Sequence, residues 1–172
     1  STKAVDVIVL PNNGNVVLAA EQAAAAEPSM HVVPTKSVPQ GVTALLAYNP
    51  EGTWEENVAA MTAVLSEVAS VEVTAAVRGV TIGGLEVEEG QHIGLLEGKL
   101  VSSEDSSEKA LMAALELTDL SSDAIVSLYY GAGSSAADAQ QVADGLEVEF
   151  PGIQVDLIDG KQHHHQYLAS VE

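Results

Sequence analysis

The 172-residue sequence lacks cysteine altogether and contains only six basic residues, of which Arg78 is the single arginine. The absence of cysteine excludes disulfide bonds, thiolate zinc sites and cysteine nucleophiles, and it fits a reducing compartment. Twenty-five acidic residues bring the formal net charge to −19. Nucleic-acid binding requires clustered lysine and arginine side chains that displace counterions from phosphates. The composition therefore argues against a nucleic-acid partner.

Long hydrophobic runs are also missing. No stretch of about 18 uncharged apolar residues occurs, so the sequence predicts no membrane span, and no basic N-terminus leads into an apolar segment as in a secretory signal. We therefore expect a cytoplasmic protein. An apolar content of 47% is ordinary for a domain that buries a core. The excess of acidic residues either covers a solvent-exposed face or attracts a basic partner over a distance.

The N-terminal region alternates strand and helix patterns. Residues 4–11 form an apolar run of strand length, Asn15 is expected to cap an alanine-rich helix that reaches about Glu27, and residues 31–33 form a second strand. Two strands joined by a helix imply parallel pairing. Pro39 then suits the first turn of a helix over residues 42–48.

A capping box of Thr53 and Glu56 predicts the start of the next helix. Its apolar residues recur at steps of four and three and are expected to face a core; they are Trp54, Val58, Met61, Leu65 and Val68.

From residue 71 the apolar pattern changes to a period of two, which is typical of strands. Glycine-containing turns separate further short strands, and Glu97-Gly98 is a two-residue hairpin signal. These strands are expected at residues 71–78, 82–87, 92–96 and 99–101.

The C-terminal region returns to alternating helices and strands, with a second capping box at Ser135 and Asp138. Its expected elements are a helix over 106–117, a strand over 123–130, a helix to about 147, a strand over 153–157 and a tail over 167–171. The whole pattern predicts one α/β domain with two strand-helix-strand lobes, at about 1–70 and 103–172, flanking a β-hairpin-rich middle at about 71–102.

Two strand-to-helix turns, at residues 11–15 and 131–135, expose helix N–H groups that are suited to an anion. Neither turn contains the lysine of a phosphate-binding loop or the full spacing of a dinucleotide-binding loop. Ordinary helix capping is the favoured interpretation, so no nucleotide site is predicted.

Three consecutive histidines, His163 to His165, invite a metal hypothesis. Alternate residues of a strand share a face, so only His163 and His165 are candidates to meet one ion. No established ligand spacing accompanies them, and we predict no metal site.

A polar loop from Thr35 to Gly41 could act with Arg78 to bind a carboxylate. Ser37 equally suits the N-cap of the helix that contains Pro39, and this interpretation is favoured. No nucleophile elbow, Ser/His/Asp arrangement or paired-carboxylate pattern supports a hydrolase.

Four segments resemble, in order and separation, the C-terminal region of the catalytic subunit of bacterial fatty acid kinase, a dihydroxyacetone-kinase-like protein with a DhaL-type kinase domain. They are VIVLPNNGNVVLAAEQAA, VVPTKSVPQGVTALLAYNP, VTAAVRGVTIGGLEVEEGQHIGLLEGKLV and QYLASVE. The PNN turn, the SVPQG segment and the AVR strand are the most specific parts. A looser similarity to the DegV-type fold supports the two-lobed architecture.

The resemblance implies that this chain begins where the third part of that protein begins, without its N-terminal kinase and middle domains. The kinase domain would hold ATP and magnesium, and this chain would hold no cofactor and have no activity of its own. The binding positions that the resemblance and the loop analysis suggest are Asn12, Asn13, Asn15, Thr35, Ser37, Gln40 and Arg78, with Val38, Pro39 and Gly41 as further matching positions. The family commonly has aspartate where this sequence has Gly79.

Three functions follow from this resemblance and from the residue patterns. The first is a docking domain that engages a lipid-binding DegV-type protein, so that its fatty acid is phosphorylated for phospholipid synthesis. The second is a pocket for a small carboxylate or acyl chain between the lobes, near Ser37 and Arg78. The third is an independent enzyme such as a phosphatase or a dihydroxyacetone kinase, for which no activated nucleophile is evident. The sequence leaves the oligomeric state open between a monomer and a homodimer.

Overall fold

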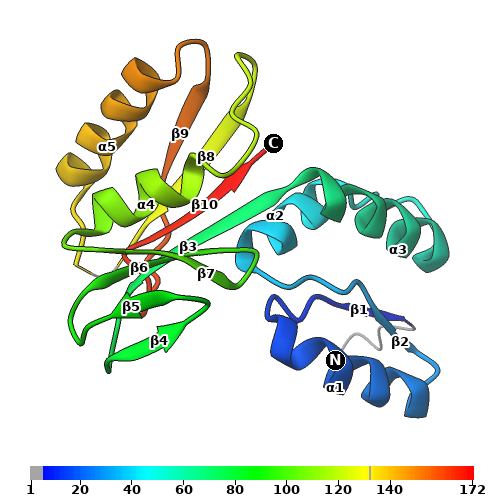
Figure 1. The fold of residues 1–172 in the computed structure, drawn as a ribbon. Helices are drawn as coiled ribbons and strands as arrows, with labels where there is room; N and C mark the ends of the chain where they lie inside the picture. The colour runs from blue at the N-terminus through cyan, green and yellow to red at the C-terminus, as the bar shows by residue number, and fades with distance from the viewer. Residues whose placement is uncertain (1–5, 132) are drawn as a thin grey trace. The chain divides into compact units, whose positions relative to one another are not determined.

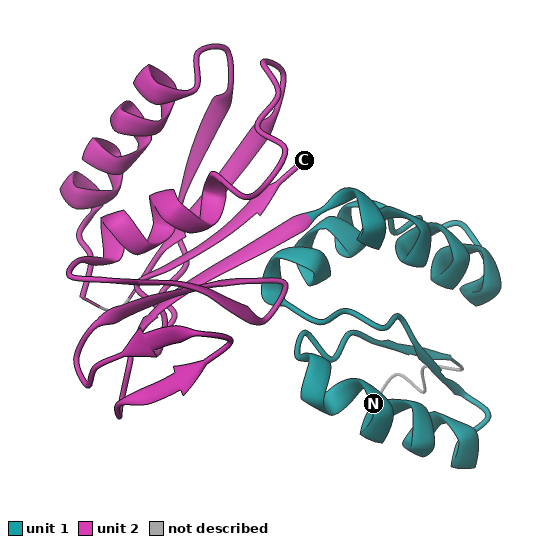
Figure 2. Ribbon diagram, in the orientation of Figure 1, with its two compact units in different colours: residues 1–68 teal, residues 69–172 magenta. Residues whose placement is uncertain are grey.

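The chain forms two compact units, residues 1–68 and residues 69–172 (Figure 2). The computed structural model describes residues 6–131 and 133–172. Unit 1 contains β1 (Val7–Val9), α1 (Gly14–Ala26), β2 (Met30–Val32), α2 (Val38–Leu46), α3 (Trp54–Ala63) and the 3₁₀ helix η1 (Val64–Glu67). Unit 2 contains β3 (Ala69–Ala75), β4 (Val80–Ile82), β5 (Leu85–Val87), β6 (His92–Leu96), β7 (Lys99–Glu104), α4 (Ser107–Leu115), β8 (Ile125–Tyr130), α5 (Ala136–Glu149), β9 (Gln154–Asp159) and β10 (Tyr167–Val171). No helix in the described part is long and apolar enough to span a membrane.

Unit 1 is built on the parallel pair of β1 and β2, which confirms the expected strand-helix-strand arrangement. Val7 lies opposite Met30, and Val9 lies opposite Val32. Helix α1 lies on one side of this pair, and α2 and α3 lie on the other (Figure 1). Residues 4 and 5 of the predicted first strand lie outside the described residues.

The helix starts of unit 1 follow local capping. Ser37 caps α2, which begins at Val38 rather than at the expected residue 42, because Pro39 in the first turn is compatible with helix. The predicted capping box of Thr53 and Glu56 is confirmed at α3.

The core of unit 1 is small. Its fully buried residues are Val33, Ala44 and Met61, with Ile8, Leu10, Ala47, Val58 and Leu65 packed against them. The prediction that the whole apolar stripe of α3 faces a core is wrong at Trp54, which is 37% exposed. Trp54 is the first residue of α3 and stacks on His31 instead, with ring centroids 3.6 Å apart.

Unit 2 contains a six-stranded sheet in the order β7-β6-β3-β10-β8-β9. The C-terminal strand β10 lies antiparallel between β3 and β8, and all five of its residues are buried. Strands β8 and β9 pair in parallel, as expected for a strand-helix-strand segment. Strands β3, β6 and β7 of the β-rich middle therefore share one sheet with the second expected lobe, whereas β4 and β5 form a separate two-stranded sheet.

Helices α4 and α5 pack on this sheet through one continuous core. Helix α4 contacts β3, β6 and β7, and α5 contacts β8 and β9. The approach of α4 is close at Gly94 of β6, where a Cβ atom would lie 2.6 Å from the Ala110 carbonyl oxygen. Glycine is thus required there by packing.

Two tight hairpins form in unit 2. Glu97 and Gly98 have positive φ angles of 50° and 72° and join β6 to β7, which confirms the predicted two-residue turn. Gly83 and Gly84 join β4 to β5 in the same way, with φ angles of 61° and 89°. The prediction that Arg78 lies on a strand is wrong, since β3 ends at Ala75 and Arg78 lies in the bend before β4.

Candidate functional site

In unit 1, a polar cluster forms where β1 and β2 end. The backbone N–H of Asn12 donates to Thr35 Oγ1 over 3.0 Å, and the backbone N–H of Lys36 donates to Gln40 Oε1 over 2.8 Å. The N–H of Gln40 donates in turn to Ser37 Oγ over 3.2 Å. The fold therefore brings together four of the predicted site residues, Asn12, Thr35, Ser37 and Gln40.

This cluster is largely closed. Thr35 is fully buried, and Ser37 and Gln40 are 5% and 6% exposed. Asn12 has a φ angle of 53°, and its side chain packs against Gly41, where a Cβ would lie 2.7 Å from Asn12 Cγ. The buried Oδ1 of Asn12 has no hydrogen-bond partner among the described residues. The cluster thus joins the β1–α1 loop to the start of α2 and offers little surface to a ligand.

Asn13 and Asn15 lie outside this cluster. The prediction that Asn15 caps α1 is wrong, because Asn13 is the N-cap and its Oδ1 accepts the backbone N–H of Asn15 over 2.9 Å. Both side chains are exposed at the start of α1. The local reason is that Asn13, with an extended backbone directly before Gly14, can accept the free N–H group of the second helical residue.

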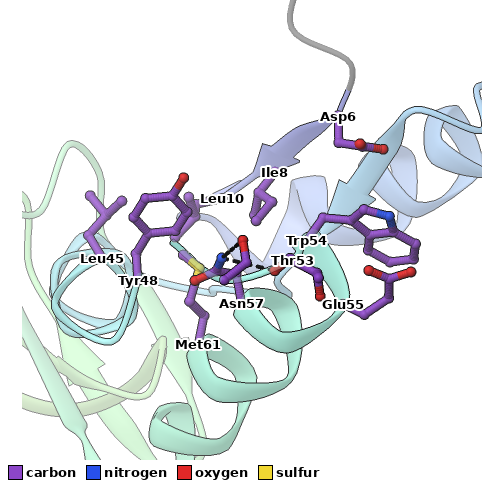
Figure 3. A pocket seen from close by; sticks show the side chains of 11 residues that line it. Asp6, Ile8, Leu10, Leu45, Tyr48, Thr53, Trp54, Glu55, Asn57 and Met61 are labelled. Carbon is purple, nitrogen blue, oxygen red and sulfur yellow. Dashed lines mark hydrogen bonds between the residues drawn. The ribbon is translucent and has the colours of Figure 1, made fainter. Parts of the chain in front are cut away.

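A pocket of about 670 Å³ opens in unit 1 between β1 and α3, with the end of α2 beside it (Figure 3). Its lining combines apolar, aromatic and acidic side chains: Asp6, Ile8, Leu10, Leu45, Tyr48, Thr53, Trp54, Glu55, Asn57 and Met61, with Gly52. We call it the Trp54 pocket. Among the residues that the structure describes, the lining contains no basic side chain, and its aromatic and acidic side chains suit apolar or cationic groups.

The walls of the Trp54 pocket are fixed by two sets of contacts. His31 stacks on Trp54 with an interplanar angle of 4°, and its Nε2 lies 3.0 Å from Asp6 Oδ1. The buried Asn57 holds the loop before α3, because its Nδ2 donates to the carbonyl oxygens of Asn49 and Thr53 over 2.9 Å each. Figure 3 shows Asn57 beside Thr53 in this pocket. Sequence analysis missed this pocket, although the aromatic residues Tyr48 and Trp54 on either side of the turn-prone segment 49–52 were a usable signal.

In unit 2, Arg78 lines a second cavity of about 450 Å³. We call it the hairpin groove, and its lining is Ala76, Val77, Arg78, Val80, Ile82, Val87, Ile93, Leu95, Gly98, Lys99 and Leu100. Lys99, which sequence analysis did not select, joins Arg78 there. Ser37 belongs to unit 1 and Arg78 to unit 2.

No cluster of three or more potential metal ligands occurs among the described residues. His165 Nε2 lies 3.3 Å from Glu72 Oε2, and the carbonyl oxygen of His164 accepts the Thr74 hydroxyl over 2.6 Å. The histidine segment thus contacts β3. At the other predicted anion-binding turn, Ser135 and Asp138 form the expected capping box; Ala132 lies outside the described residues.

Comparison with known proteins identifies relatives over the full chain. The family of FakA-like C-terminal domains of fatty acid kinase matches residues 1–172. Protein YloV of Bacillus subtilis is 35% identical over 173 residues, which cover 100% of this chain and 31% of YloV. An uncharacterized protein of Staphylococcus epidermidis is 36% identical over 166 residues, covering 96% of this chain and 30% of that protein. The chain thus spans about a third of the length of these relatives.

Solved structures of DegV-type proteins share its fold. The fatty acid kinase B3 protein of Streptococcus pneumoniae, solved with linoleic acid, superposes with a TM-score of 0.64 at 14% identity, covering 99% of this chain and 73% of that one. The DegV family protein Cg2579 of Corynebacterium glutamicum gives a TM-score of 0.63 at 15% identity, covering 97% and 74%. The predicted α/β, DegV-like fold is therefore confirmed. With the family match over the whole chain, this protein belongs to the FakA-like fatty acid kinase family and corresponds to its C-terminal domain.

Proposed function

We propose that this chain is the partner-docking domain of a fatty acid kinase. It would engage a lipid-binding DegV-type protein in the cytoplasm, so that the bound fatty acid is phosphorylated by the kinase domain of the parent polypeptide. ATP and magnesium would be held by that kinase domain. The observation that carries the proposal is the match of the FakA-like C-terminal family over residues 1–172.

The polar cluster where β1 and β2 end is a poor site for a small ligand, and this supports protein docking as the function. Thr35 and Gln40 are almost completely buried, and they accept hydrogen bonds from the backbone of Asn12 and Lys36. A carboxylate binding at this edge would have to displace these bonds, and an unmade buried hydrogen bond costs about 1–3 kcal/mol. A protein partner that binds elsewhere on the surface leaves these hydrogen bonds in place.

The surface of unit 1 has a composition suited to a protein contact. Leu45, Tyr48 and Trp54 are 57%, 47% and 37% exposed beside one pocket. Tryptophan and tyrosine are enriched at the energetic centres of protein interfaces.

A small carboxylate or acyl ligand is the second candidate, and the hairpin groove favours it because an arginine and a lysine border an otherwise apolar cavity. Such lining suits an amphipathic anion. Unlike the docking function, this candidate predicts binding of the isolated ligand.

Calorimetric titration of this chain with the DegV-type fatty-acid-binding protein of the same organism tests the proposal. Each titration is run with lipid-loaded and lipid-free partner, and at two salt concentrations. We expect saturable binding that weakens at higher salt. An unrelated acidic protein of similar size serves as the control for non-specific attraction. Absence of saturable binding in both lipid states would exclude the docking function, and sedimentation of the chain alone would report whether it forms a homodimer.

A further inference from the structure

The hairpin of β4 and β5 has two chemically different faces. Its cross-strand pairs are Val80 with Val87, Ile82 with Leu85, and Thr81 with Glu86. Because alternate strand residues share a face, the four aliphatic side chains lie on one face and the polar pair on the other. An isolated two-stranded hairpin needs its apolar face covered in order to be stable.

That apolar face is only partly covered by unit 2. Val87 is 5% exposed, but Val80 and Ile82 are 39% and 52% exposed, and the neighbouring Val77 is 88% exposed. All four line the hairpin groove together with Leu100 and other aliphatic residues of β6 and β7. Single exposed aliphatic residues are common on proteins, whereas a group around one cavity indicates an interaction site.

The charge around the hairpin groove is opposite to that of the protein as a whole. Arg78 and Lys99 line the groove, and no acidic residue of the described part of the chain does, although the chain has 25 acidic residues and only six basic ones. Neither cation forms an ion pair with a residue that the structure describes. Glu86, Glu88 and Glu89 line a separate surface depression of the same hairpin. The groove therefore combines an apolar floor with two available cations.

We propose that the hairpin groove is a docking surface for the DegV-type partner, and that it receives an apolar segment of the partner bearing an aspartate or glutamate side chain. This inference rests on the proposed docking function and adds its location and chemistry. Apolar side chains of the partner would contact Val80, Ile82 and Leu100, and the carboxylate would lie between Arg78 and Lys99. Val77, which is 88% exposed, adds apolar surface that a protein partner can cover.

The test is the same calorimetric titration, carried out with variants of the full chain. Arg78→Glu combined with Lys99→Glu reverses both charges, and Val77→Asp places a charge on the apolar rim. The matched controls are Lys109→Glu on α4 and Val148→Asp on α5, since Lys109 is also exposed and Val148 is 80% exposed. All five side chains are exposed, so circular dichroism and the melting temperature should match the unmodified chain.

We expect the double charge reversal and Val77→Asp each to weaken partner binding by about tenfold or more, and the controls to change it less than about twofold. The double reversal should also alter the salt dependence of the affinity, because exposed charges at an interface are screened by salt. Unchanged affinity of both groove variants, with the unmodified chain binding normally, would refute the inference and leave the docking function standing.

Two further outcomes are decisive. If the unmodified chain does not bind the partner at all, the docking function and this inference fail together. If dodecanoate alone binds saturably and the double reversal abolishes this binding while partner affinity is unchanged, the groove is a small-ligand site and the inference is wrong.

Discussion

The separate cores of the two units predict that a mutation in one core destabilises that unit selectively. Met61 is 1% exposed and belongs to the core of unit 1, whereas Leu128 is fully buried in the core of unit 2. Trp54 is the only tryptophan of the chain and lies in unit 1. Its fluorescence therefore reports unfolding of unit 1, while far-ultraviolet circular dichroism reports both units.

The expected effect of Met61→Ala is large relative to the stability of unit 1. Truncation of a buried methionine to alanine costs about 2–5 kcal/mol. A unit of this size has a total stability of about 3–10 kcal/mol at the usual value per residue. With a urea m-value of about 1.5 kcal/mol/M, a loss of about 3 kcal/mol lowers the midpoint of the fluorescence transition by about 2 M.

Urea unfolding followed by both signals measures this effect, with Leu128→Ala as the matched control. Met61→Ala should move the Trp54 transition to lower urea and leave a later circular-dichroism transition in place. Leu128→Ala should move the later transition instead. If both variants shift both signals equally, the two units unfold as one cooperative structure and the reasoning from separate cores is refuted.

Three further predictions concern single contacts. Gly94→Ala should lower the stability of unit 2 by about 1–3 kcal/mol, because the new methyl group meets the backbone of α4; equal melting curves would contradict the close packing. Hydrogen bonds from the hydroxyl and then the backbone N–H of Ser135 lower the pKa of the Asp138 carboxyl. The ionised carboxylate therefore stabilises the folded state above the unfolded pKa of about 3.9, and this stabilisation is lost as the pH falls through the lower native pKa. Asp138→Asn should therefore lower the melting temperature at neutral pH and have no effect in strong acid. Asn57→Ala should cost about 1–3 kcal/mol in the Trp54 transition, because the N–H and carbonyl of Asn49 lose their partner; an unchanged transition would show that the loop is held by other contacts.

Local signals in the sequence predicted local structure well. The capping boxes at Thr53 and Ser135 and the turn at Glu97 form as expected, since each depends on hydrogen bonds or dihedral angles within a few residues. The same type of reasoning placed the α1 cap two residues too late, at Asn15. Two asparagines near one helix start make alternative caps of similar energy, and the backbone angles of Asn13 decide between them.

The candidate site was predicted only in part. The resemblance and the polar loop selected Asn12, Thr35 and Gln40, which do meet where β1 and β2 end. Their burial could not be predicted, because it depends on how α2 packs against the loop after β1. The groove around Arg78 was missed for the same reason, since Lys99 comes from a different hairpin 21 positions along the chain.

The sequence by itself determined the α/β class, the parallel strand-helix-strand segments, most helix starts and the family. It did so because side-chain periodicity, caps and turns act over a few residues, and because matching segments in order identify relatives. Only the tertiary structure decided that β10 occupies the middle of the sheet, that Arg78 and Lys99 share an apolar groove, and that the strand-end cluster is closed. Each of these depends on contacts between residues distant in sequence, whose pairing is set by sheet register and core packing rather than by local pattern.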